Sequence, residues 1–199
     1  MDPMTLLDTV QDRAASVVAQ ISAEQMGAPS ACAGWDVRTC LNKLVTSTRY
    51  WVVALNEGRS DPALDLGNPP DLIGADALGA YRAAAAACRS AFERPGVFTA
   101  MVPCSVPGVQ LSGEQMLGVR IFDTTVITWD LATAVGVAHG ISDEQADFAR
   151  AVSEVVLPAV SGASDRQRFQ PCTVGLDANA SAVDRLIAAT GRNPQWAPA

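Results

Sequence analysis

The sequence lacks the features that mark exported, membrane-surface and nucleic-acid-binding proteins. It has no run of basic residues, and its 14 lysines and arginines stand against 21 acidic residues, for a net charge of -7. Such a field repels nucleic acid and anionic lipid, so we expect neither as a partner. The first four residues lack a basic start followed by an apolar core and do not indicate a secretory signal. The predicted location is the cytoplasm.

Histidine is also scarce, and the cysteines are not paired in the sequence. His139 is the only histidine, and the five cysteines form no C-x-x-C pair, a pattern typical of reduced thiols in a cytoplasm. Cys32 precedes a predicted helix and could be a reactive thiol, but a half-buried structural cysteine is the better interpretation. No P-loop, G-x-G-x-x-G or G-x-S-x-G motif is present, so neither nucleotide cofactors nor a serine triad is supported.

Apolar sequence is plentiful enough for one sizeable core. The chain has 199 residues, of which 49% are apolar and 18% charged, so a single domain over residues 1–199 is the simplest prediction. Its longest apolar stretch, 116–138, is interrupted by Arg120, Asp123 and Asp130. Charges inside such a stretch are costly in a bilayer, so it predicts a buried helix of a soluble protein.

Hydrophobic periodicity and helix-end signals predict five or six helices joined by short loops. Asp36 is expected to cap one helix, and the capping boxes that begin at Ser112 and Ser142 are expected to open two others. Residues 97–111 predict a short strand or an extended crossover. The fold class is therefore mainly all-α, a helical bundle. The helices are expected over 4–21, from 36 to the loop at 58, 76–93, 112–136, 142 to about 158, and 182–190.

Three motifs occur in a recognisable order. They are Cys-Ala-Gly-Trp-Asp-Val-Arg at 32–38, Thr-Trp-Asp-Leu-Ala-x-Ala-x-Gly at 128–136, and Asp-Arg-Leu-Ile-Ala-x-Thr-Gly-Arg-Asn-Pro-x-Trp at 184–196. As a set they resemble the actinobacterial branch of the DinB/YfiT-like family, in which mycothiol-dependent maleylpyruvate isomerase is the characterised type of enzyme. The resemblance implies a DinB-like four-helix bundle that holds a divalent metal, usually zinc or nickel, near one end.

The same resemblance implies three metal ligands, a histidine, a glutamate and a second histidine, at the positions of Lys43, Asp123 and Ile127. The last two are four residues apart and so share one helix face. Only Asp123 could ligate, because Ile127 has no donor atom and Lys43 would first have to lose a proton. His139 lies more than three helical turns from Asp123 and does not replace a ligand. We therefore expect no metal and no other cofactor.

Lys43 and Asp123 would place one positive and one negative group at the same cavity. Lys43 could pair with Asp123, bind an anionic group or simply be solvated. A buried pair could do acid–base work, because burial lowers the pKa of a lysine and raises that of a carboxylate, while their attraction opposes both shifts. Lys43 and Asp123 are the candidate catalytic residues.

Further polar and apolar residues are expected to line the same pocket. Two of them follow Lys43 on its helix face, and the others share the central helix with Asp123. Structural alternatives are a salt bridge from Arg120 to Asp123 and a capping or pairing role for Asp130 within the bundle. The predicted substrate-binding residues are Ser47, Tyr50, Arg120, Ile127 and Asp130.

Three functions remain open from the sequence. The first is a metal-independent DinB-fold enzyme, an isomerase, transferase or cyclase that acts on a small organic molecule, for example in a tailoring step of secondary metabolism. The second is a non-catalytic protein that binds a small molecule or a protein partner. The third is a mycothiol-dependent isomerase or transferase, which is disfavoured because the resemblance implies that a metal activates the thiol. A small molecule is the expected partner, and a homodimer is left open.

Overall fold

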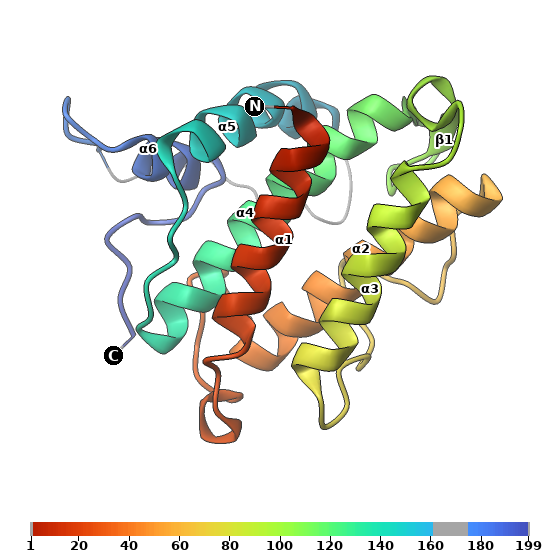
Figure 1. The fold of residues 1–199 in the computed structure, drawn as a ribbon. Coiled ribbons are helices and arrows are strands. Elements are labelled where there is room, and N and C mark those ends of the chain that lie inside the picture. The colour runs from red at the N-terminus through yellow and green to blue at the C-terminus, as the bar shows by residue number, and fades with distance from the viewer. Residues whose placement is uncertain (1, 161–174, 199) are drawn as a thin grey trace.

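The computed structural model describes residues 2–160 and 175–198, and this part of the chain is mostly helical (Figure 1). Within these described residues, six α-helices are accompanied by two short 3-10 turns and one pair of short strands. The loop expected between residues 158 and 171 lies mainly outside the described residues. The helices are α1 (Pro3–Val18), α2 (Val37–Glu57), α3 (Ala77–Phe92), α4 (Gly113–Val135), α5 (Asp143–Val160) and α6 (Ala182–Ala189).

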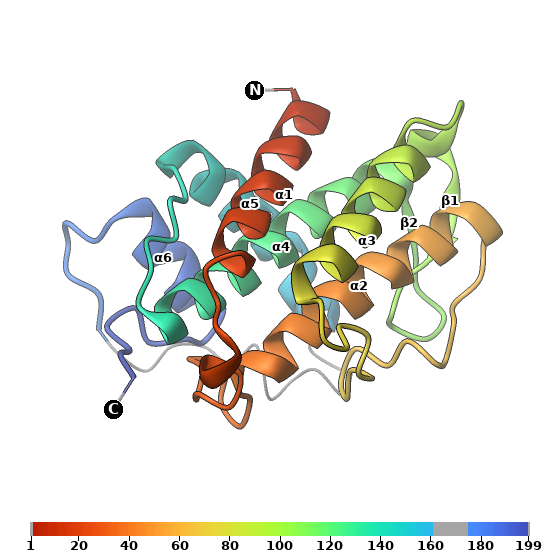
Figure 2. The same ribbon diagram turned by 60° about the horizontal axis from the view of Figure 1, so that its bottom comes forward.

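Helices α1 to α4 form a four-helix bundle. Helix α4 packs against α1 and α2, and α3 closes the ring by packing against the same two helices. Helix α5 packs on α4 outside this ring, and α6 packs on α5 (Figures 1 and 2). The predicted all-α bundle with additional helices is confirmed. No helix within the described ranges is both long and apolar enough to cross a membrane.

The predicted helix ends are largely confirmed by their hydrogen bonds. The carboxylate of Asp36 caps α2, and that of Asp76 caps α3, each by accepting a first-turn backbone N–H at 2.8 Å. Ser112 and Gln115 form the reciprocal capping box of α4, with distances of 3.2 and 2.9 Å. Helix α4 ends at Gly136, whose φ of 73° lies in the left-handed region that glycine adopts without strain.

Two helices differ in extent from those that hydrophobic periodicity and the proline predict. Helix α1 stops at Val18, because the chain then tightens into i to i+3 hydrogen bonds, such as the one from Ile21 N to Val18 O at 3.2 Å. Helix α5 continues past Pro158 to Val160, the last described residue before position 175. A proline removes one backbone donor but keeps a helical φ, so it did not end the helix where it stands.

The predicted strand or crossover is a small antiparallel hairpin. Strand β1 (Met101–Pro103) pairs with β2 (Gln110–Ser112), and Val102 lies opposite Leu111. The second strand leads directly into the N-cap of α4. The hairpin therefore positions the start of the central helix.

Helix α4 is buried along most of its length, including its polar residues. Arg120 and Asp130 are each 1% exposed. The hydroxyls of Thr124, Thr125 and Thr128 each donate to the backbone carbonyl four residues earlier, at 2.7 to 2.8 Å. These local hydrogen bonds satisfy hydroxyl groups that would otherwise be costly to bury. The core of the bundle consequently contains a layer of polar side chains along α4.

Candidate functional site

The relative register of α2 and α4 determines which predicted residues can meet. Near the middle of the two helices, the Ser47 hydroxyl accepts a hydrogen bond from Arg120 at 2.8 Å. Toward the start of α2, burial raises the pKa of the Cys40 thiol, and the nearby carboxylate of Asp130 raises it further. The helices are therefore antiparallel. Residue 43 falls between these two contacts, beside the part of α4 that includes Asp123.

Arg120 is the most deeply buried cation of this region. Its Nε and Nη2 atoms donate to the Thr124 hydroxyl at 2.8 and 2.5 Å. Its Nη1 atom donates to Ser47 and, at 3.1 Å, to Oδ2 of Asp123. The predicted salt bridge between Arg120 and Asp123 is confirmed. Because Arg120 is 1% exposed, any influence on a ligand would pass through the groups that it holds.

Asp123 is the most accessible member of this group. Its side chain is 14% exposed, whereas that of Arg120 is 1% exposed. Among the described residues, its only hydrogen bond is the one that Oδ2 accepts from Arg120. The ion pair thus fixes the orientation of the carboxylate, while Oδ1 has no hydrogen-bond partner in the described part of the chain.

Lys43, on α2, contacts the loop that follows its helix. It is 6% exposed, and its Nζ donates to the carbonyl oxygen of Leu66 at 3.0 Å. The contact ties α2 to the loop that follows it. The alternative of a solvated Lys43 is therefore wrong. Ile127, on α4, is 4% exposed and belongs to the apolar core between the helices.

Tyr50 faces a cavity between that loop and the hairpin. Its hydroxyl lies 2.8 Å from the hydroxyl of Ser60, and burial raises its pKa. A cavity of about 420 Å³ is lined by Tyr50, by the loop and by the tip of the hairpin, including Leu66 and Cys104. Of the predicted site residues, only Tyr50 lines this cavity, so the structure does not place it with Asp123.

Asp130 forms a buried ion pair with the C-terminal segment. Its two carboxylate oxygens accept from Nε and Nη2 of Arg192 at 2.7 and 2.8 Å, and both side chains are at least 94% buried. Burial raises the pKa of Asp130, and the guanidinium opposes this shift. Sequence reasoning missed Arg192, although it lies in the third motif, because the motif does not say what the arginine contacts. The alternative of a pairing role for Asp130 is confirmed, but its partner lies in the C-terminal segment and not in the four-helix bundle.

Comparison with known proteins places the chain in a family. The family model described as "Mycothiol maleylpyruvate isomerase N-terminal domain" matches residues 7–132, more than half of the chain. The chain belongs to this family. Similar proteins include two from Mycobacterium tuberculosis, of strains CDC 1551 and H37Rv, both described as uncharacterized. Each is 27% identical over 146 residues, which cover 73% of this chain and 74% of the relative. No solved structure matches the chain.

The residues at the three positions that the motif resemblance gives as metal ligands do not fit a metal. Ile127 offers no donor atom, and the Lys43 ammonium donates to a carbonyl oxygen. Asp123 alone cannot form the three-ligand set that such sites need. No three His, Cys, Asp or Glu side chains that could hold a metal ion gather within residues 2–160 and 175–198.

The remaining candidates in this family member have local structural contacts. His139 follows α4, and its Nδ1 accepts from the backbone N–H of Ile141 at 3.0 Å. Burial lowers the pKa of His139. This agrees with the interpretation of His139 as a helix-end residue. Cys32 is 3% exposed, so it is more buried than the half-buried thiol expected from the sequence.

Proposed function

We propose that this chain is a metal-independent enzyme of the DinB fold that transfers a proton within a small organic molecule. Asp123 is the proposed proton acceptor, and Lys43 is the proposed stabiliser of negative charge. The observation that carries the proposal is the oriented carboxylate of Asp123, which is held at Oδ2 by buried Arg120 and is partly exposed.

In the proposed step, Oδ1 of Asp123 takes a proton from a carbon next to a substrate carbonyl. The electron pair of that C–H bond moves toward the carbonyl oxygen, and the Lys43 ammonium stabilises the resulting enolate. Return of the proton to a different carbon completes an isomerisation with no net change in atoms or electrons. A fixed base and a nearby cation are the groups that this chemistry requires. Ser47 and Arg120 are proposed to position the base.

Asp123→Asn tests the base, because an asparagine oxygen can still accept from Arg120 but cannot take a proton. The probe is a filtered small-molecule extract of a mycobacterium, incubated with each protein and compared by mass spectrometry. We expect the wild-type protein to consume at least one metabolite and form an isomer of equal mass. The variant should do so at least about 100-fold more slowly. Asp143→Asn, at the exposed start of α5, is the matched control.

Lys43→Met tests the cation separately. It keeps most of the side-chain volume and should slow conversion strongly, with a modest loss of stability because the Leu66 carbonyl loses its donor. Unchanged conversion by the Asp123 and Lys43 variants would overturn the proposed roles. Stoichiometric zinc or nickel in protein purified without chelator would overturn metal independence. Metal independence would also be overturned if the protein converted maleylpyruvate only when both mycothiol and metal were added.

A second function, non-catalytic binding of a small molecule, is favoured by one observation. An apolar cavity of about 450 Å³ lies between the hairpin, α4 and α5, with Leu111, Val119, Phe148 and Val152 in its lining. Its volume suits an organic ligand. In the same extract experiment, a metabolite that co-purifies unchanged with both the wild-type protein and Asp123→Asn would support binding over catalysis.

A further inference from the structure

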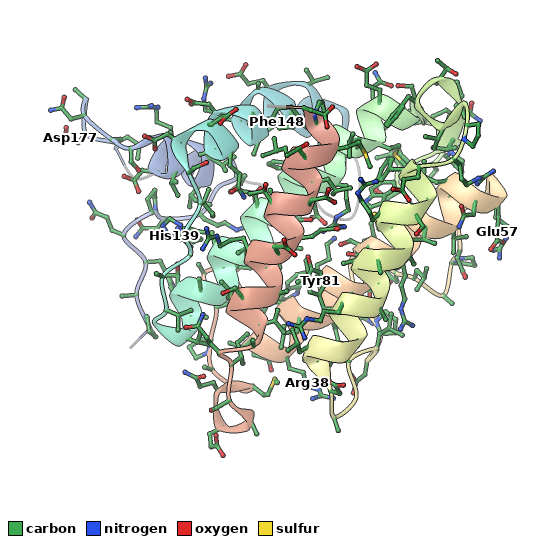
Figure 3. All side chains as sticks on the ribbon, in the orientation of Figure 1. Arg38, Glu57, Tyr81, His139, Phe148 and Asp177 are labelled. Atoms are coloured by element: carbon green, nitrogen blue, oxygen red, sulfur yellow. The ribbon has the colours of Figure 1, made fainter. Side chains whose placement is uncertain are left out.

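A groove of about 610 Å³ lies between α1 and α3, on a different face from the α2–α4 site. The two helices run side by side in Figures 1 and 2, and Figure 3 labels Tyr81 in α3 beside α1. Their register is antiparallel, because Asp8 pairs with Arg89 at 2.7 Å and Gln11 donates to the carbonyl of Ala85 at 3.4 Å. Small residues, among them Ala15, Ala85 and Ala86, also line the groove.

The two walls of this groove carry opposite charges. Asp12 is exposed on the α1 wall, and Arg82 is exposed on the α3 wall. Neither has an ion-pair or hydrogen-bond partner among the described residues. The contact between Gln11 and Ala85 places Asp12 and Arg82 within about one helical turn of each other along the groove. The flexible side chain of Arg82 can span such an offset.

We propose that a second copy of this chain packs on this groove across a two-fold axis parallel to the groove. Such an axis exchanges the two walls, so α1 of one protomer faces α3 of its partner. Each residue keeps its position along the groove. Asp12 then meets the partner's Arg82, and symmetry repeats the ion pair. Self-complementarity of this kind is what a two-fold interface requires. The alanines beside the charges permit close approach of the helices, and the second copy matches the charges on the groove walls.

A charge swap tests this dimer in the full-length protein. Dimerisation is measured by sedimentation equilibrium for the wild type, Asp12→Arg, Arg82→Asp and the double variant that carries both changes. We expect each single reversal to weaken dimerisation at least about tenfold, because it places like charges opposite each other. The double variant restores opposite charges across the interface and should recover dimerisation. Arg59→Asp, at an arginine with 55% side-chain exposure away from the groove, should have no effect.

The result that supports the proposal is loss in both single variants and recovery in the double variant. A wild-type protein that stays monomeric at high micromolar concentration overturns it and leaves a different partner for the groove. Equal dimerisation of the wild type and single variants, or failure of the double variant to recover, also overturns it. Circular dichroism confirms that each variant is folded, and Arg82→Gln, which removes the charge without reversing it, should weaken the dimer less than Arg82→Asp. If the dimer proposal fails, the proposed activity of Asp123 is unaffected.

Discussion

Removing Arg192 should destabilise the protein strongly, because this arginine neutralises the buried carboxylate of Asp130. Its guanidinium donates to both oxygens of Asp130 at 2.7 and 2.8 Å, and the two side chains are 6% and 2% exposed. Arg192→Met keeps much of the apolar stem of the side chain but removes every donor. Asp130 would then be a buried carboxylate without its charge partner.

The expected loss follows from the burial of the pair. Breaking a buried ion pair by removing one partner costs about 3–5 kcal/mol. For a domain of this length, each kcal/mol lowers the melting temperature by about 2–4 °C, so the expected decrease is about 6–20 °C.

The loss of stability in Arg192→Met should depend on pH. Burial raises the pKa of Asp130, and removal of Arg192 raises it further, so the variant loses stability as pH rises through the folded-state pKa. It should be least destabilised near or below the unfolded pKa.

The assay is urea unfolding followed by circular dichroism for Arg192→Met, Asp130→Asn and the double variant. The double variant should lose less than the sum of the single variants, with a coupling of at least about 1 kcal/mol. Arg185→Met, at an exposed arginine of α6, is the matched control and should change stability by less than about 0.5 kcal/mol. A cost below about 1 kcal/mol for Arg192→Met, or strict additivity, would refute the reasoning.

Two further predictions concern protonation and metal. The lowered pKa of His139 means that the fold favours the neutral ring, so stability is present above the unfolded pKa and declines as pH falls through the folded pKa. His139→Gln should flatten the decline in melting temperature between about pH 7.5 and 5.5; an unchanged profile would contradict this. The triple variant Lys43→His, Asp123→Glu, Ile127→His should bind zinc or nickel and melt at a higher temperature with metal. Failure to bind would mean that these positions do not converge.

Much of the fold could be predicted because its signals are local. Asp36 and Ser112 mark helix starts with side chains that reach only three residues along the chain. Gly136 marks a helix end through its own backbone conformation. The continuation of α5 past Pro158 was harder to predict, since a proline can stand inside a helix as well as just after one.

The candidate site was only partly predictable. The spacing of Arg120 and Asp123 was enough to propose their salt bridge, because residues three apart are neighbours on a helix. Helical spacing also grouped Tyr50 with Lys43. The structure instead directs the Tyr50 hydroxyl toward Ser60, in a loop whose path periodicity does not describe. Arg192 was missed for the same reason, since 62 residues separate it from Asp130.

The helical segments, most of their ends and the family follow from the sequence alone, because they depend on neighbouring residues and on motif order. The partners of Lys43 and Asp130 emerged only from the folded structure. Lys43 donates to a loop carbonyl, and Asp130 is held by the C-terminal segment. The physical reason is that a buried charge must find a partner wherever the fold brings one within reach, and that distance is not encoded in local spacing.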